Sequence, residues 1–233
     1  MAIYGISDLH LSLGTNKPMD IFGMQWLDHH EKIRANWLDI VTDEDIILIP
    51  GDISWALTIE EFMPDLEFIN SLPGKKILLR GNHDYWWTSL NKVRSILPNN
   101  CYALQNDSII LGNDIVLAGS RGWTCPNDRE YTQHDQKIYE RELIRLELSL
   151  ADAAKHSCNE LWVMMHYMPT NDKHEHNELI SLMTRYQVSK VLYGHLHSYG
   201  HDIKIEGTHW DIEFHLISCD YINFIPKKIA SLI

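Results

Sequence analysis

Short apolar runs recur along the chain and are separated by longer stretches of mixed polarity. Six of these runs predict strands, because each is five to seven residues long, largely apolar and bounded by glycine, proline or charged residues. Their continuous apolar character indicates strands that are buried on both faces of a sheet. The predicted strands are residues 2–7, 45–50, 75–80, 113–119, 160–165 and 189–193.

The intervening stretches show the spacing of apolar residues that is typical of amphipathic helices. Glu60 and Glu61 fall in the first turn of one of them, where the helix dipole favours acidic residues. Alternation of apolar and polar residues over 208–218 predicts an antiparallel strand pair. Together these elements predict an α/β fold with mixed sheets and helices on the outside. The predicted helices are residues 26–40, 58–70, 89–97 and 136–156.

Residues of metal-ligating types directly follow five of the predicted strands. Glycines 51, 81 and 194 precede several of them and allow the chain to turn sharply. In an α/β sheet such strand ends converge on one crevice, so these loops are expected to meet. The loops are Asp8-Leu9-His10, Gly51-Asp52, Gly81-Asn82-His83-Asp84, His166 and Gly194-His195-Leu196-His197.

The chemistry of these loops suits divalent metal ions. Carboxylate, amide and imidazole groups without thiolates match Mn, Fe, Zn, Ni or Co. Any single motif is weak, since a Gly-Asp pair is usually a turn and a lone histidine such as His166 is more often a core residue than a ligand. All five motifs in one order, each at a strand end, predict a metal site.

The series of motifs, which spans residues 8–197, resembles the calcineurin-like metallophosphoesterase superfamily. The resemblance implies a four-layer α/β/β/α sandwich with two mixed sheets, in a single domain over residues 1–233. It also implies a binuclear centre at the C-terminal edge of the sheets. By the same resemblance, Asp8, His10 and His197 hold one ion, Asn82, His166 and His195 hold the other, and Asp52 bridges the two.

The reaction implied by the resemblance is hydrolysis of a phosphate ester, in which a hydroxide shared by two divalent ions attacks phosphorus in line. His83 is then the proton donor to the leaving group and, with Asn82, a contact of the substrate phosphate. The alternative for His83 is that it only packs its turn. Arg121 is a further candidate for holding the substrate phosphate, with a surface arginine as an equally weighted alternative.

The sequence departs from the Ser/Thr protein phosphatase branch of the superfamily. Those enzymes carry the pattern GDxxDRG, whereas Trp55 here stands in the place of the second Asp and the Arg is absent. The expected substrate is therefore a small-molecule phosphodiester or phosphomonoester, a choice that the sequence leaves open. The alternatives are a protein phosphatase and a non-catalytic scaffold with this fold, and a scaffold predicts missing ligands or a missing proton donor.

Composition narrows the class of partner. The formal net charge of −12 disfavours broad nucleic-acid binding. The four cysteines lie far apart without a CxxC pair, which predicts reduced thiols rather than a disulfide framework. The first residues show no basic segment followed by a long apolar run, so we expect no signal peptide or membrane span and a cytoplasmic location.

The roles of Asp84 and of the aromatic residues after the motifs stay open in the sequence. The aromatic residues are candidates for a wall that contacts an aryl group of the substrate. The favoured interpretation is that they cover the core beneath long loops. These residues are Trp55, Tyr85, Trp86, Trp87 and Trp123.

Overall fold

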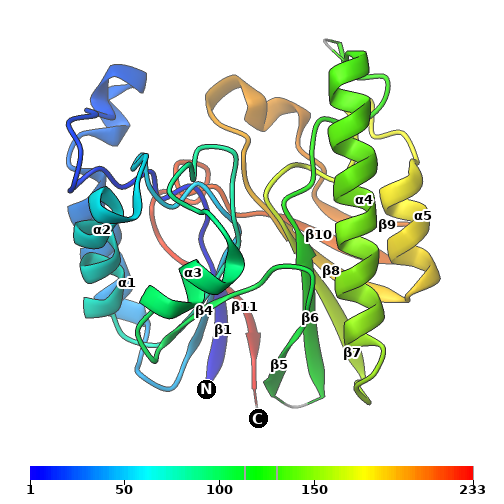
Figure 1. Ribbon diagram of the computed structural model, residues 1–233, viewed down its shortest axis with the longest axis horizontal. Coiled ribbons are helices and arrows are strands. Elements are labelled where there is room, and N and C mark those ends of the chain that lie inside the picture. Colours follow the sequence, from blue (N-terminus) through cyan, green and yellow to red (C-terminus); the bar gives the residue numbers. More distant parts are fainter. Residues whose placement is uncertain (113, 130, 233) are drawn as a thin grey trace.

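Two β-sheets packed face to face form the centre of the molecule, and helices cover the outer side of each (Figure 1). The computed structural model describes residues 1–112, 114–129 and 131–232. In the first sheet, the strand order is β11-β1-β2-β3-β4 and only β11 runs antiparallel to its neighbour. These strands are β1 (Ala2–Gly5), β2 (Ile46–Ile49), β3 (Lys75–Leu78), β4 (Cys101–Ala103) and β11 (Lys227–Ser231).

The second sheet has the order β5-β6-β7-β8-β10-β9. Its four central strands are parallel, while the two edge strands, β5 and β9, are antiparallel to their neighbours. The predicted strand pair near the C-terminus is confirmed as β9 and β10. The strands are β5 (Ile109–Gly112), β6 (Ile115–Ser120), β7 (Glu160–Met165), β8 (Val188–Tyr193), β9 (Gly207–His209) and β10 (Ile212–Leu216).

Three hydrophobic layers hold these elements together. The layer between the sheets joins side chains such as Leu48 of β2 and Trp162 of β7, both fully buried. The outer layers lie under α1–α3 on one side and under α4 and α5 on the other. The central strands are therefore covered on both faces, which explains their continuous apolar sequence. The helices are α1 (His29–Ile40), α2 (Ile59–Ser71), α3 (Leu90–Ile96), α4 (Gln133–Ala153) and α5 (Glu178–Arg185).

The predicted α/β fold with two mixed sheets is confirmed, and the layers follow the expected order of helices, sheet, sheet and helices. Several boundaries differ from the prediction. Residues 24–26 form a 3₁₀ turn, so α1 starts at His29. Helix α4 starts earlier than predicted, because Thr132 and Asp135 form a capping box at its N-terminus. Residue 113, the predicted start of one strand, lies outside the described residues, and that strand runs from Ile115 to Ser120.

Four elements were not predicted: β4, β5, β11 and α5. The three strands are only three to five residues long, and β5 and β11 are mostly partly buried, so any apolar run in them is too short to indicate a strand by itself. Helix α5 is only eight residues long, which leaves little room for a helical period to show. Among the helices that the structure describes, each is too short or too polar to cross a bilayer.

Candidate metal centre

The five motif loops meet at the C-terminal edge of both sheets, as the sequence predicts. Backbone hydrogen bonds join them: Asp8 N–H donates to the Gly51 carbonyl at 3.0 Å, and His10 N–H donates to the Asp52 carbonyl at 2.9 Å. On the second sheet, Gly194 N–H donates to the carbonyl of His166 at 3.1 Å. These bonds hold the backbones of neighbouring loops together and so bring their side chains to one place.

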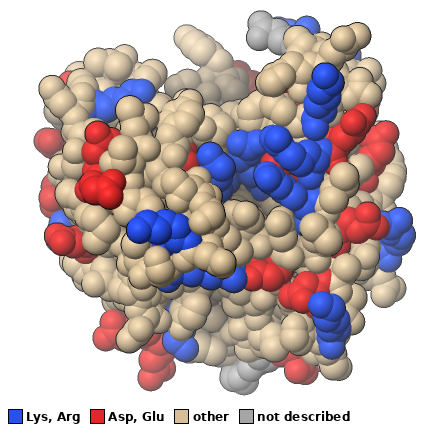
Figure 2. All heavy atoms as spheres, viewed as in Figure 1, with Lys and Arg blue, Asp and Glu red and all other residues tan. Residues whose placement is uncertain are grey.

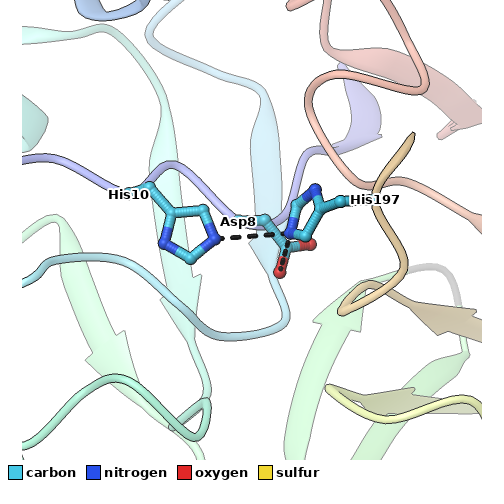
Figure 3. A group of neighbouring side chains, drawn as sticks. All are labelled: Asp8, His10 and His197. Atoms are coloured by element: carbon cyan, nitrogen blue, oxygen red, sulfur yellow. Dashed lines mark hydrogen bonds and ion pairs between the residues drawn. The ribbon is translucent and has the colours of Figure 1, made fainter. Parts of the chain in front are cut away.

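One group of side chains comprises Asp8, His10 and His197, whose nearest ligand atoms all lie within 4.8 Å of one another. The Nε2 atoms of the two histidines are 3.3 Å apart, and His197 Nε2 lies 3.5 Å from Asp8 Oδ1. Figure 3 shows the three side chains directed toward one another, Asp8 and His10 from the loop after β1 and His197 from the loop after β8. This group matches the set that the resemblance assigns to the first ion.

A second group comprises Asp52, His166 and His195. His166 Nε2 lies 3.4 Å from Asp52 Oδ2, 3.3 Å from His195 Nδ1 and 2.7 Å from the side-chain oxygen of Asn82. Asp52 Oδ2 is also 3.9 Å from His10 Nε2, so this carboxylate lies between the two groups. Its position is the one expected of a bridging ligand.

The donor set fits divalent cations. Asp8 and Asp52 are buried, yet within the described part of the chain their ion-pair partners are histidines only, without lysine or arginine. Buried carboxylates of this kind require positive charge nearby. Imidazole, carboxylate and amide oxygen at such distances are the ligands that Mn, Fe, Zn, Ni or Co accept.

The protonation of the histidines agrees with this fit. Burial lowers the pKa of His10 to about 4 and that of His195 to about 3, so both present a neutral imidazole with a free lone pair near pH 7. At His197 burial acts in the same direction, but the carboxylates of Asp8 and Asp220 outweigh it and raise the pKa to about 10. The same carboxylates that favour a proton on His197 favour a metal cation beside it.

Four of the predicted ligands adopt a left-handed backbone conformation. Their φ angles are 59° for Asp8, 44° for His10, 49° for Asp52 and 70° for His195. Non-glycine residues adopt such angles at a cost in free energy, and they concentrate at functional sites. Gly81 allows the loops to approach, because a Cβ atom there would lie 2.1 Å from Asp52 Oδ1.

Asp84, whose role the sequence left open, fixes the loops rather than facing a ligand. Its carboxylate accepts hydrogen bonds from the backbone N–H groups of Ile53, Ser54 and Gly81 at 2.7–3.1 Å and from the indole of Trp86 at 3.0 Å. Burial, with a further contribution from Asp52, raises the pKa of Asp84 to about 6. Asp84 therefore ties the loop after β2 to the loop after β3.

The variant Asp84→Asn is expected to be less stable than the native protein by about 1–3 kcal/mol, because the amide NH₂ must face at least one buried N–H donor. Urea unfolding followed by circular dichroism measures this difference. Asp39→Asn, at an exposed position of α1, provides a matched control. Equal midpoints for Asp84→Asn and the native protein would refute the assigned role.

Asp220 is a residue of the site that sequence reasoning missed. Its Oδ1 accepts a hydrogen bond from His197 Nδ1 at 2.8 Å, and its Oδ2 accepts one from the backbone N–H of Ser198 at 3.3 Å. Such a carboxylate orients a ligating histidine and raises its basicity. The available signal was the position of Asp220, four residues beyond the end of the apolar strand β10.

Removal of this carboxylate in Asp220→Ala is expected to weaken metal binding about 10–100-fold, the range typical of residues that orient a ligand. Competition titration with a metal-sensitive dye measures the affinity. Asp202→Ala, exposed in the neighbouring 3₁₀ segment, is the control. If both variants bind metal as tightly as the native protein, Asp220 does not support the site.

His83 lies beside the ligands and outside both groups. Its backbone N–H donates to Asp52 Oδ1 at 2.8 Å, and its ring centroid lies 4.3 Å from that of Trp55. Burial lowers the pKa of His83, while the charge of Asp52 opposes this shift. The half-buried imidazole lines a cavity that adjoins the ligands, where a proton donor is expected.

This cavity has a volume of about 780 Å³ and adjoins the first group of ligands. Trp55 forms one wall, and its ring stacks on His10 with a centroid distance of 4.9 Å. The ammonium group of Lys17 lies 3.3 Å above the same indole. Further lining residues are Met19, Phe22, Trp26 and Tyr85.

The aromatic residues after the motifs lie in three different places. Trp86 and Trp87 are buried and cover the core, as the favoured interpretation expects. Trp55 and Tyr85 instead line the cavity. Trp123 packs on Tyr167 at a centroid distance of 4.9 Å, away from the cavity lining. The wall that contacts a substrate is therefore expected to involve only part of the predicted cluster.

Arg121 faces a different hollow from the one that His83 lines. Its guanidinium lies 3.3 Å from Oε1 of Glu142 on α4 and packs over the ring of Trp123. Its side chain is 15% exposed, so it is not a free surface arginine. The structure does not bring this side chain into the cavity beside the ligands.

Comparison with known proteins agrees with the geometry. The model of a protein family described as calcineurin-like phosphoesterase matches residues 1–199. No curated protein matches the chain. Among solved structures, the chain is similar to the crystal structure of AQ665 from Aquifex aeolicus, a protein of unknown function, with 16% identity and a TM-score of 0.52. That similarity covers 97% of this chain and 95% of the other, and at this identity it concerns the fold alone.

Proposed function

Because the chain belongs to the calcineurin-like phosphoesterase family, we propose that it is a hydrolase of small-molecule phosphate esters that uses two divalent metal ions. The observation that carries the proposal is the pair of ligand groups, with Asp52 between them and His83 beside them. The family in general comprises metal-dependent phosphoesterases. When bound, divalent ions at such a site lower the pKa of a water molecule and offset the charge of phosphate oxygens.

The ligands divide between two positions. Asp8, His10 and His197 would hold one ion, and Asn82, His166 and His195 would hold the other. Asp52 would contact both, since its Oδ2 atom approaches a histidine of each group. His166 is oriented for this role because its Nδ1 lies 3.0 Å from the carbonyl oxygen of Pro50, which leaves Nε2 to face the site.

His83 supplies the proton that the leaving oxygen needs. Its backbone N–H is bound by Asp52 and its ring packs against that of Trp55, so the imidazole lines the cavity. A general acid placed in this way contributes about 10²–10⁴-fold to the rate. Asn82 and His83 are the residues proposed to contact the phosphate group itself.

The cavity supports a small molecule as substrate. About 780 Å³ lies within the range of roughly 300–1,000 Å³ that is typical of small-molecule sites. Its aromatic walls favour an apolar or flat leaving group, and Lys17 at its rim favours an anionic substrate. These features support a position of the leaving group on the side of Trp55 and Tyr85.

Two measurements test the proposal together. The first is metal content by elemental analysis, for which we expect about two ions per chain. The second compares p-nitrophenyl phosphate with bis-p-nitrophenyl phosphate after addition of Mn, Fe, Ni, Co or Zn. Preference for the bis-ester identifies a phosphodiesterase and preference for the mono-ester a phosphomonoesterase. Absence of turnover with every metal would contradict the proposal and favour a non-catalytic scaffold.

A further inference from the structure

A group of arginines surrounds a small hollow next to α4, apart from the cavity that His83 lines. Its volume is about 110 Å³, and no residue lines both spaces. Figure 2 shows the corresponding concentration of basic side chains beside α4 on a molecule whose formal net charge is −12. The arginines that line the hollow are Arg80, Arg121 and Arg145.

Positive charge in the hollow exceeds negative charge. Glu142 is the one acidic residue among the lining side chains, and it is 1% exposed. It pairs with both Arg145, at 2.6 Å, and Arg121, at 3.3 Å. Arg80 has no ion pair among the residues that the structure describes. One carboxylate thus faces three guanidinium groups, and the arginines repel one another unless an anion joins them.

Hydrogen-bond donors in the hollow are also in excess. The Nε atoms of Arg80 and Arg121 are buried and have no hydrogen-bond partner in the described chain. Gln105 lines the same space, and its side-chain oxygen already accepts a hydrogen bond from the indole of Trp87 at 3.0 Å. The amide NH₂ of Gln105 is therefore available as a hydrogen-bond donor toward the hollow. Unpaired buried donors of this kind are rare and call for an acceptor.

We propose that this hollow, formed by Arg80, Arg121, Arg145 and Gln105, binds a phosphate-sized oxyanion. A volume of about 110 Å³ equals roughly three to four water molecules at ~30 Å³ each, which is enough for one phosphoryl group. Guanidinium groups match the tetrahedral oxyanion through charge-assisted hydrogen bonds.

The hollow lies directly behind two ligand loops of the candidate metal centre. Arg80 immediately precedes Gly81 and Asn82. The backbone carbonyl of Arg121 accepts hydrogen bonds from the N–H groups of His166 at 3.1 Å and of Tyr167 at 2.9 Å. An anion that fixes both arginines therefore also restrains the backbone that carries Asn82 and His166. The site itself does not depend on the proposed hydrolysis, because it is defined by binding alone.

Isothermal titration of the purified full chain with inorganic phosphate tests the proposal. In the double variant Arg80→Gln/Arg145→Gln, the dissociation constant of the hollow is expected to rise at least about 10-fold, the loss typical of hydrogen bonds to charged groups. In Glu142→Gln, phosphate should bind more tightly, because the competing carboxylate is gone. This gain cannot arise from a misfolded variant. Arg185→Gln, at an exposed arginine of α5, serves as the control.

Methylphosphonate, whose P–C bond resists hydrolysis, distinguishes the source of the oxyanion. Binding of phosphate alone identifies free phosphate as the ligand, whereas binding of both identifies the phosphoryl end of a larger molecule. Either result supports the site, provided that the affinity changes in the arginine variants. A phosphate affinity that is the same in the native protein, the double variant and Glu142→Gln would overturn the proposal and leave the metal centre as the place of binding.

Discussion

The variant His83→Ala is expected to hydrolyse esters with alkyl leaving groups about 10²–10⁴-fold more slowly than the native protein while it retains its metal ions. The reason is chemical: an alkoxide leaves poorly unless it is protonated, and His83 is the imidazole that lines the cavity without belonging to either ligand group. With p-nitrophenyl esters the defect should be much smaller, because that leaving group needs little help from an acid.

Steady-state rates on paired alkyl and p-nitrophenyl substrates, together with metal analysis of each preparation, measure this effect. His156→Ala, at an exposed position, controls for the loss of a histidine elsewhere. A His83→Ala protein that turns over alkyl esters at the native rate rules out the proton-donor role. The remaining interpretation would then be that His83 only packs its turn against Trp55.

The variant Asp52→Asn is expected to lower metal affinity by more than the ~10–100-fold typical of residues that only orient a ligand, and to abolish measurable turnover. Asp52 Oδ2 faces His10 of one group and His166 of the other, so a single carboxylate serves both positions. Its replacement by a neutral amide removes the negative charge that both cations share. Bound metal should fall from about two ions per chain toward one or none.

Elemental analysis after gel filtration, with activity measured on the same samples, gives the metal count and the rate together. Asp39→Asn again provides an exposed control of the same chemical change. Full metal content and native turnover in Asp52→Asn would show that this carboxylate is not a shared ligand. Full metal content with lost turnover would instead restrict Asp52 to a role in catalysis, and the bridging assignment would fail.

Most of the positions at the candidate site could be predicted because each is marked by the sequence immediately around it. Each lies directly after a buried apolar run, and parallel strands bring their carboxyl ends to one edge. The central strands could be predicted for a similar reason. Burial on both faces requires a continuous apolar run, such as that of β2. The assignment of Asp8, His10 and His197 to one ion and of Asn82, His166 and His195 to the other, with Asp52 as the bridge, came from the family resemblance, not from spacing.

What the sequence did not reveal depends on contacts between distant segments. Asp220 follows the strand β10, as the ligands follow other strands, but only the fold shows that it pairs with His197. Arg121 follows a strand, as the ligands do, yet Glu142 on α4 draws its side chain away from the cavity. The cavity wall formed by residues 15–26 belongs to an irregular segment with 3₁₀ turns, where no period exists to be recognised.

The left-handed backbone at Asp8, His10, Asp52 and His195 has a consequence for how the protein tolerates change. Each such residue costs about 1 kcal/mol or more in the folded state. Glycine would adopt the same angles freely but would remove the ligand. Selection for stability alone would therefore replace these ligands. Substitutions here that stabilise the fold are expected to lower activity. A chain engineered for higher stability should gain it in the helical layers and leave these four positions as they are.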